Sequence, residues 1–155
     1  SIVLNDPTST DSGCETTNGT ITTSATGGTG EVTYSLNGGA SQASGTFTNL
    51  AAGTYSVTVT DEENCSATKE HQVLTGISLE DDIMPLLLAQ CTFSTCHNGD
   101  NGDDRNWTQK EDVLAKASII KSRTQSGAMP RDPGVLTPEE VDMIACWVDD
   151  GALDN

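Results

Sequence analysis

Basic residues are scarce in this sequence. Its 155 residues include 7 Lys and Arg against 23 Asp and Glu, which gives a formal net charge of −16 at pH 7. A field of this sign repels nucleic acid and anionic lipid, so we expect neither as a partner, whereas basic protein surfaces and cations are attracted. The same charge also favours solubility. The sequence shows no hydrophobic run long enough for a membrane-spanning helix.

The composition changes part-way along the chain. Residues 1–77 are rich in Thr, Ser and Gly and contain 8 acidic residues and 1 basic residue, which leaves 15 acidic and 6 basic residues for 78–155. Patterns typical of helices occur only in the second part. The shift predicts two domains, a β domain over residues 1–77 and a helical domain over residues 78–155.

The first part has the periodicity of short antiparallel strands. Val32, Tyr34 and Leu36 alternate with polar residues, as half-buried strands do. Strands are predicted over residues 21–25, 32–36, 55–59 and 68–73. Glycine-rich segments between them are typical of turns. A small β-sandwich is therefore expected.

The second part has recognisable helix starts. Ser78 with Asp81, and Thr108 with Glu111, each have the spacing of a side-chain cap. The last predicted helix covers residues 138–150 and follows Thr137. These signals predict a small all-α domain.

The chemistry of this part is carried by Cys91, Cys96 and His97. Two thiols with a histidine directly after the second are the arrangement that binds haem covalently, because the thiols add to the vinyl groups and the imidazole then binds the iron. Four residues separate the two cysteines here. The pattern favours an electron-carrying haem protein.

Met129 is the candidate for the opposite iron ligand. It lies 32 positions after His97, between Gly127 and Pro130, in a segment predicted as a loop. A thioether is a soft, neutral ligand that favours reduced iron. The competing methionines, Met84 and Met143, lie within predicted helices.

Residues 78–155 resemble class I monohaem c-type cytochromes, in particular the small cytochrome-like domains of secreted Bacteroidetes proteins. The segments "CTFSTCHNG", "SRTQSGAMP" and "LTPEEVDMIACWVDDGA" carry the likeness. It implies one covalent haem c held by Cys91 and Cys96, with His97 and Met129 as iron ligands. It also implies a cytochrome c-like all-α fold.

The segment from Cys14 to Cys65 resembles the SprB-type repeat of surface adhesins in gliding Bacteroidetes. The likeness rests on "GTITTSATGGTGEVTYSLNGG" and "FTNLAAGTYSVTVTDEENC". It implies an immunoglobulin-like sandwich with a disulfide between Cys14 and Cys65. The expected fold class is thus an all-β immunoglobulin-like sandwich followed by a small all-α cytochrome c-like domain.

Other interpretations of the cysteines remain open. Cys91, Cys96 and His97 could form part of a zinc site, for which Cys146 and His71 would have to supply the missing ligand. Cys91 and Cys96 could instead form a local disulfide. Cys146 could be partly buried, could pair with Cys91, or could bridge two molecules.

Three weaker signals accompany the haem motif. Trp107 and Arg123 carry N–H groups suited to binding haem propionates, although both also suit packing or surface roles. Asp100, Asp103 and Asp104 lie on a Gly-rich loop that could bind calcium. That loop lacks the closing glutamate of the twelve-residue calcium motif, so a solvated acidic loop is the favoured interpretation.

The sequence thus predicts an exported, single-electron carrier and not an enzyme. We expect an extracellular, cell-surface or periplasmic location after removal of a signal peptide, and redox partners with basic docking surfaces. The β module would serve as a spacer, docking or assembly surface, and homo-oligomers or filaments could form by strand addition. The alternative is an adhesion or filament protein with a structural helical domain. Peroxidase-like or sensor activity would require Met129 to be off the iron.

Overall fold

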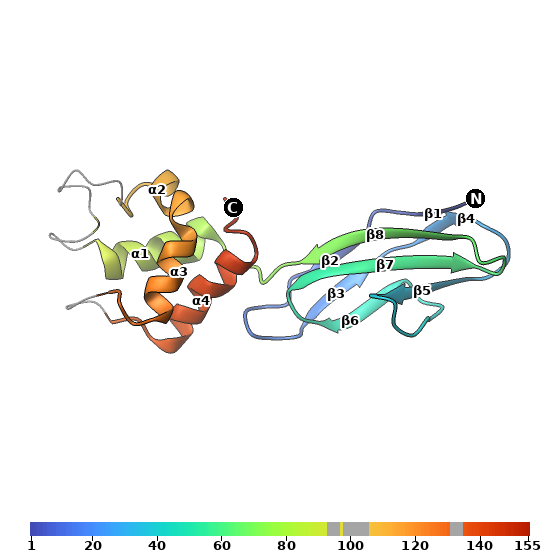
Figure 1. Cartoon of the computed structure of the whole chain (residues 1–155), viewed down its shortest axis with the longest axis horizontal. Coiled ribbons are helices and arrows are strands. Elements are labelled where there is room, and N and C mark those ends of the chain that lie inside the picture. Colours follow the sequence, from blue (N-terminus) through green and yellow to red (C-terminus); the bar gives the residue numbers. More distant parts are fainter. Residues whose placement is uncertain (93–96, 98–105, 131–134) are drawn as a thin grey trace. The chain divides into compact units, whose positions relative to one another are not determined.

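The chain divides into two compact units. The computed structural model describes residues 1–92, 97, 106–130 and 135–155. The first unit is Ser1–Thr75 and the second is Gly76–Asn155. Within the described residues, Figure 1 shows the strands in the first unit and the helices in the second.

The first unit contains eight described strands in three antiparallel sheets. The sheets have the orders β1-β4, β2-β3-β6 and β5-β7-β8. The strands are β1 (Ile2–Leu4), β2 (Thr8–Thr10), β3 (Gly19–Thr22), β4 (Ala25–Gly27), β5 (Val32–Leu36), β6 (Thr46–Leu50), β7 (Gly53–Asp61) and β8 (Ser66–Val73).

The longest strand, β7, shows why this part of the sequence forms a sheet. Val57 and Val59 are fully buried, whereas Thr58 between them is partly exposed, so the strand presents one apolar face. On the other face the hydroxyl of Thr58 lies 2.8 Å from that of Thr68 on β8. The buried residues of the core come from several sheets: Ile2, Leu4, Ile21, Tyr34, Phe47, Leu50, Val57, Val59 and Val73.

The N-terminal segment lies along β8. The Ser12 N–H donates to the Leu74 carbonyl over 2.8 Å, and Lys69 Nζ lies 2.5 Å from Asp6 Oδ1. The hydrogen bond and charge of Lys69 lower the pKa of Asp6. These contacts join the first strands to the last strand of the unit.

The predicted pairing of Cys14 with Cys65 is wrong. Cys14 is disulfide-bonded, whereas Cys65 is an exposed free thiol. Cys65 directly precedes β8, and Cys14 lies two residues after Ser12, which bonds beyond the far end of that strand. A strand of eight residues spans about 25 Å, whereas the Cα atoms of a disulfide lie within about 7 Å of each other. Figure 1 shows the β7–β8 turn and the β2–β3 loop at opposite ends of the unit.

The second unit contains a π-helical turn and four described α-helices. These elements are η1 (Leu79–Ile83), α1 (Met84–Cys91), α2 (Lys110–Ala115), α3 (Ala117–Gln125) and α4 (Pro138–Asp149). The Ser78 hydroxyl accepts from the Asp81 N–H at the start of η1, as the sequence predicts. Helix α2 instead begins after Gln109, so the predicted cap at Thr108 is wrong.

Helix α4 begins as its sequence predicts and carries the centre of the core. The Thr137 side chain accepts from the Glu140 N–H, and the Glu140 carboxylate accepts from the Thr137 N–H at 2.7 Å, which completes a capping box. Trp147 is fully buried. Its core neighbours are aliphatic, aromatic and thiol side chains: Leu79, Ile83, Leu87, Cys91, Trp107, Val113, Ala117, Ile120 and Ile144.

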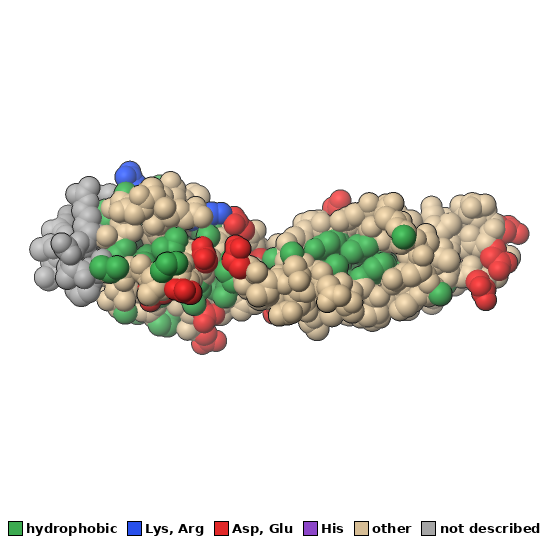
Figure 2. Space-filling model, turned by 90° about the horizontal axis from the view of Figure 1, so that it is seen from below, with side chains coloured by type: hydrophobic (Ala, Val, Ile, Leu, Met, Phe, Trp, Pro, Cys, Tyr) green, Lys and Arg blue, Asp and Glu red, His purple; other side chains and the backbone are tan. Residues whose placement is uncertain are grey.

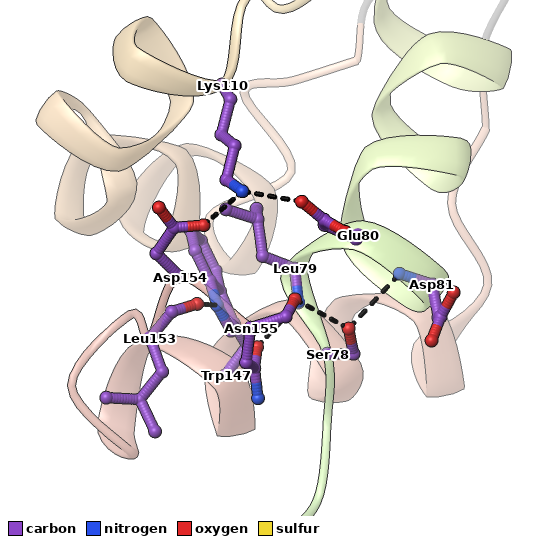
Figure 3. A network of polar contacts seen from close by, with 9 residues as sticks. All are labelled: Ser78, Leu79, Glu80, Asp81, Lys110, Trp147, Leu153, Asp154 and Asn155. Atoms are coloured by element: carbon purple, nitrogen blue, oxygen red, sulfur yellow. Dashed lines mark hydrogen bonds and ion pairs between the residues drawn. The ribbon is translucent and has the colours of Figure 1, made fainter.

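The C-terminal residues cap the beginning of η1 (Figure 3). The Asn155 carbonyl accepts from the Glu80 N–H at 3.1 Å, and its side-chain oxygen accepts from the Leu79 N–H at 3.0 Å. Lys110 Nζ binds the Asp154 carboxylate and lies 2.6 Å from Glu80 Oε1. Hydrogen bonds to Asp154 and Glu80 raise the pKa of Lys110 above its usual range. The network thus joins the tail, η1 and α2.

The predicted fold class, an all-β immunoglobulin-like sandwich followed by a small all-α cytochrome c-like domain, is wrong. The described part of the chain has a mixed composition, with eight strands, four α-helices and a helical fraction of 29 %, and its two units do not form the predicted immunoglobulin-like sandwich and cytochrome c-like module. The described strands form three small sheets, and the three-residue strands β1 and β4 pair only with each other. The helical elements include a π-helical turn and the six-residue α2.

None of the helices in the described part of the chain is long and apolar enough to cross a membrane.

Candidate functional site

Cys91 occupies the last position of α1. Its side chain is buried together with that of Leu87, one turn earlier on the same helix face. The helix ends at Thr92, whose hydroxyl donates to the Leu88 carbonyl over 2.7 Å. Cys96, the second cysteine of the motif, lies outside the described residues.

His97 lies directly against the end of α1. Its N–H donates to the Cys91 carbonyl over 3.2 Å, and its own carbonyl accepts from the Trp107 N–H at 2.9 Å. The rings of His97 and Trp107 pack together with centroids 4.7 Å apart and planes inclined by 34°. The structure therefore brings together three of the residues that the sequence singled out: Cys91, His97 and Trp107.

Trp107 is held by the turn that precedes α2. The Asn106 N–H donates to Asp112 Oδ2 over 3.2 Å. Asn106 Oδ1 in turn accepts from the Thr108 N–H at 3.1 Å and from the Thr108 hydroxyl at 2.6 Å. Thr108 therefore stabilises this turn and does not cap α2. The sequence signal that could have shown this is Asn106 itself, because Asn side chains often bond the backbone two residues later.

Met129 and Arg123 lie together at the end of α3. The Met129 N–H donates to the Arg123 carbonyl over 3.1 Å, and the Met129 side chain is half-buried. The chain turns at Gly127, which has a positive φ of 69°. The Arg123 side chain is exposed. In the view of Figure 1, the C-terminal ends of α1 and α3 lie toward the same side of the helical unit.

The types of donor at the described site are compatible with haem. An imidazole and a thioether are common axial ligands of haem, and thiols are needed for its covalent attachment. Within the described residues, no group of three or more His, Cys, Asp or Glu side chains could hold a metal ion. His71, considered as a zinc ligand, lies on β8 with its Nε2 atom 3.0 Å from the Ser9 hydroxyl.

Of the remaining residues considered from the sequence, Cys146 is described and the three calcium candidates are not. Cys146 is buried and disulfide-bonded. Asp100, Asp103 and Asp104, the calcium candidates, lie outside the described residues.

Charge is unevenly distributed on the face that Figure 2 shows. Acidic side chains occur on both units, whereas basic side chains appear only on the helical unit. Lys121 of α3 forms an ion pair with Asp149 of α4, and Lys110 is engaged in the network at η1. Two of the few basic side chains of the helical unit, Lys110 and Lys121, are therefore engaged in ion pairs with acidic residues.

Comparisons with known proteins add no further assignment, because no family model, curated protein or solved structure matches this chain.

Proposed function

We propose that the helical unit binds one haem c covalently and that the protein carries single electrons outside the cytoplasm. Cys91 and Cys96 would form the thioether bonds, and His97 and Met129 would bind the iron. The observation that carries the proposal is the placement of His97 against the end of the helix that bears Cys91, with its N–H 3.2 Å from the Cys91 carbonyl. The likeness of the motif to monohaem c-type cytochromes points the same way.

Bound at these residues, a haem would supply a one-electron Fe(III)/Fe(II) couple. The protein's part is to hold the ligands. In this proposal Cys91, at the end of α1, would bind a vinyl group, and His97, whose ring lies against that of Trp107, would bind the iron. Met129, in the turn after α3, would supply a neutral thioether, which favours reduced iron. Arg123, exposed on the last turn of α3, is a candidate to bind a propionate.

The charge of the protein favours a basic redox partner. A net charge of −16 attracts a positively charged docking surface and speeds encounter at low ionic strength. The strand-containing unit would then provide spacing, docking or assembly. In this proposal the protein is an electron carrier and not an enzyme.

The visible spectrum of the purified protein tests the proposal. We expect sharp reduced bands that survive acid-acetone extraction, and a pyridine haemochrome spectrum whose position separates two thioethers from one. A Cys96→Ser variant should shift the spectrum toward a single thioether, whereas Cys65→Ser should leave it unchanged, because Cys65 lies in the other unit. A colourless protein after export from a host with haem-attachment machinery would contradict the proposal and favour an adhesion or assembly role.

Binding of external ligands separates an electron carrier from a peroxidase-like protein or sensor. If Met129 occupies the iron, carbon monoxide and cyanide should bind slowly, and Met129→Ala should accelerate their binding. Rapid binding to the unsubstituted protein would contradict the assignment of Met129.

A further inference from the structure

We propose that Trp107 is a positioning residue that fixes the orientation of the His97 imidazole for iron binding. The inference rests on the proposed function and adds to it a residue that acts through the ligand, not on the iron itself. Residues that orient a metal-binding histidine commonly govern how firmly it holds the metal.

The ring contact is the first observation. The centroids of the His97 and Trp107 rings lie 4.7 Å apart, with an interplanar angle of 34°. This separation is within the range in which aromatic rings attract each other through offset packing. An imidazole packed in this way has less freedom to rotate about its side-chain bonds.

The backbone contacts of His97 are the second observation. Its N–H is bound to the Cys91 carbonyl, and its carbonyl is bound to the Trp107 N–H. Trp107 therefore contacts His97 twice, once through the main chain and once through the ring. The backbone of His97 is held on both sides, and the ring contact adds a restraint on the direction of the imidazole.

Trp107 is itself held rigidly, as a positioning residue must be. Its side chain is 5 % exposed and belongs to the hydrophobic core of the helical unit. The preceding residue, Asn106, is bound to both Asp112 and Thr108. The orientation of Trp107 is thus determined by the core and by the start of α2.

The two tryptophans of the chain differ in how their indole N–H groups are used. Trp147 Nε1 donates to the Leu153 carbonyl over 3.0 Å and so has a structural acceptor. Among the described residues, no such acceptor is seen for Trp107 Nε1. At the candidate site Trp107 contacts His97 through its ring.

The ring contact can be measured in the haem-free full-length protein by NMR. In the unsubstituted protein, the indole ring current should displace the imidazole C–H resonances of His97 upfield. Trp107→Leu should abolish this displacement, and Trp107→Phe, which keeps a smaller aromatic ring, should retain part of it. His71 is the internal control, because it is the only other histidine and lies on β8; its resonances should not move.

A substitution elsewhere in the same core distinguishes loss of the His97–Trp107 contact from a general loss of stability. Leu87→Ala removes a fully buried side chain from the same core and should destabilise the unit, yet leave the His97 resonances displaced. If Trp107→Leu does not fold, Trp107→Phe still gives a measurable change. Identical His97 resonances in the unsubstituted protein, Trp107→Phe and Trp107→Leu would overturn the inference.

The haem-loaded protein supplies the second measurement. Trp107→Leu should keep its covalent haem content in the pyridine haemochrome assay but show a larger high-spin fraction in the oxidised spectrum, because a less restrained imidazole binds iron less firmly. An unchanged spin state would overturn the positioning role while leaving the proposed function intact. Absence of haem from the unsubstituted protein would overturn both, even if NMR shows the ring contact.

Discussion

At the scale of single residues, Asp61 organises the end of β7. It is buried, and its carboxylate accepts from the backbone N–H groups of Cys65 at 2.8 Å, Glu63 at 3.0 Å and Thr29 at 3.1 Å. Burial acts to raise the pKa of Asp61, but the backbone donors favour the charged form and the net effect lowers it. One carboxylate therefore joins the β7–β8 turn to the loop before β5.

The lowered pKa of Asp61 predicts a pH dependence of stability. Because the unfolded chain takes up this proton at a higher pH than the folded one, the stabilisation is present above about pH 4 and is lost as the pH falls through the folded pKa. Asp61→Asn should lower stability at pH 7 and reduce the loss between pH 7 and pH 3. Urea unfolding followed by the NMR ring resonances of Tyr34 and Tyr55, which both lie in the first unit, would measure this. An equal loss in both proteins would contradict the role of Asp61.

The cysteines give a second prediction at this scale. Cys14→Ser should lower the free energy of unfolding by about 2–5 kcal/mol, the usual effect of losing a native disulfide. Cys65→Ser is the matched control and should change it by less than about 0.5 kcal/mol, because Cys65 is an exposed free thiol. Mass spectrometry after alkylation of the native protein should find label on Cys65 and none on Cys14. Label on Cys14 would show that the disulfide is absent.

At the scale of secondary-structure elements, α4 depends on its N-terminal capping box. Thr137→Ala removes the side-chain acceptor for the Glu140 N–H and should cost about 1 kcal/mol. Thr108→Ala tests the cap that the sequence wrongly predicts at α2. It should cost less than Thr137→Ala, because the Thr108 N–H still binds Asn106 in that variant. Both tryptophans lie in the helical unit, so tryptophan fluorescence during urea unfolding compares the two. Equal costs would contradict the assignment of the caps.

The elements differ in how well their sequences predicted them. Strand β5 lies where its alternating pattern placed it, and β7 and β8 contain the predicted segments 55–59 and 68–73. Strands β1, β2, β4 and β6 were not predicted; the first three have only three residues each, too few to show a period, whereas β6 has five. They exist as strands because antiparallel partners from elsewhere in the chain supply their hydrogen bonds.

At the scale of the whole molecule, two separate cores predict two responses to substitution. Ile144 belongs to the core of the helical unit and Val57 to that of the strand-containing unit, and both are fully buried. Ile144→Ala should destabilise the helical unit by about 2–5 kcal/mol, as seen by tryptophan fluorescence.

Val57→Ala provides the reciprocal control. It should shift the unfolding transition seen through the tyrosines, Tyr34 and Tyr55, which both lie in the first unit. The tryptophan-detected transition should then stay in place. If each substitution moved both transitions equally, the two units would unfold as one cooperative structure.

At the candidate site, the sequence predicted which residue types take part, whereas their spatial neighbours are known only from the structure. The Cys91, Cys96 and His97 motif pointed to haem without any coordinates, because covalent attachment requires these groups at close spacing. The packing of Trp107 on His97 was not predictable, since 10 positions separate the two residues and no periodic pattern links them. It arises because His97 and the turn before α2 meet at the end of α1.

The sequence by itself determined the charge, the haem-like motif, the start of α4 and the strands with a clear alternation, because each depends on residues close together in the chain. Only the tertiary structure decided that Cys14 and Cys65 lie apart, that short polar segments form strands, and that Asn155 caps η1. These features depend on which distant backbone groups meet. These long-range backbone contacts depend on the packing of the whole core, so a local sequence pattern does not predict them.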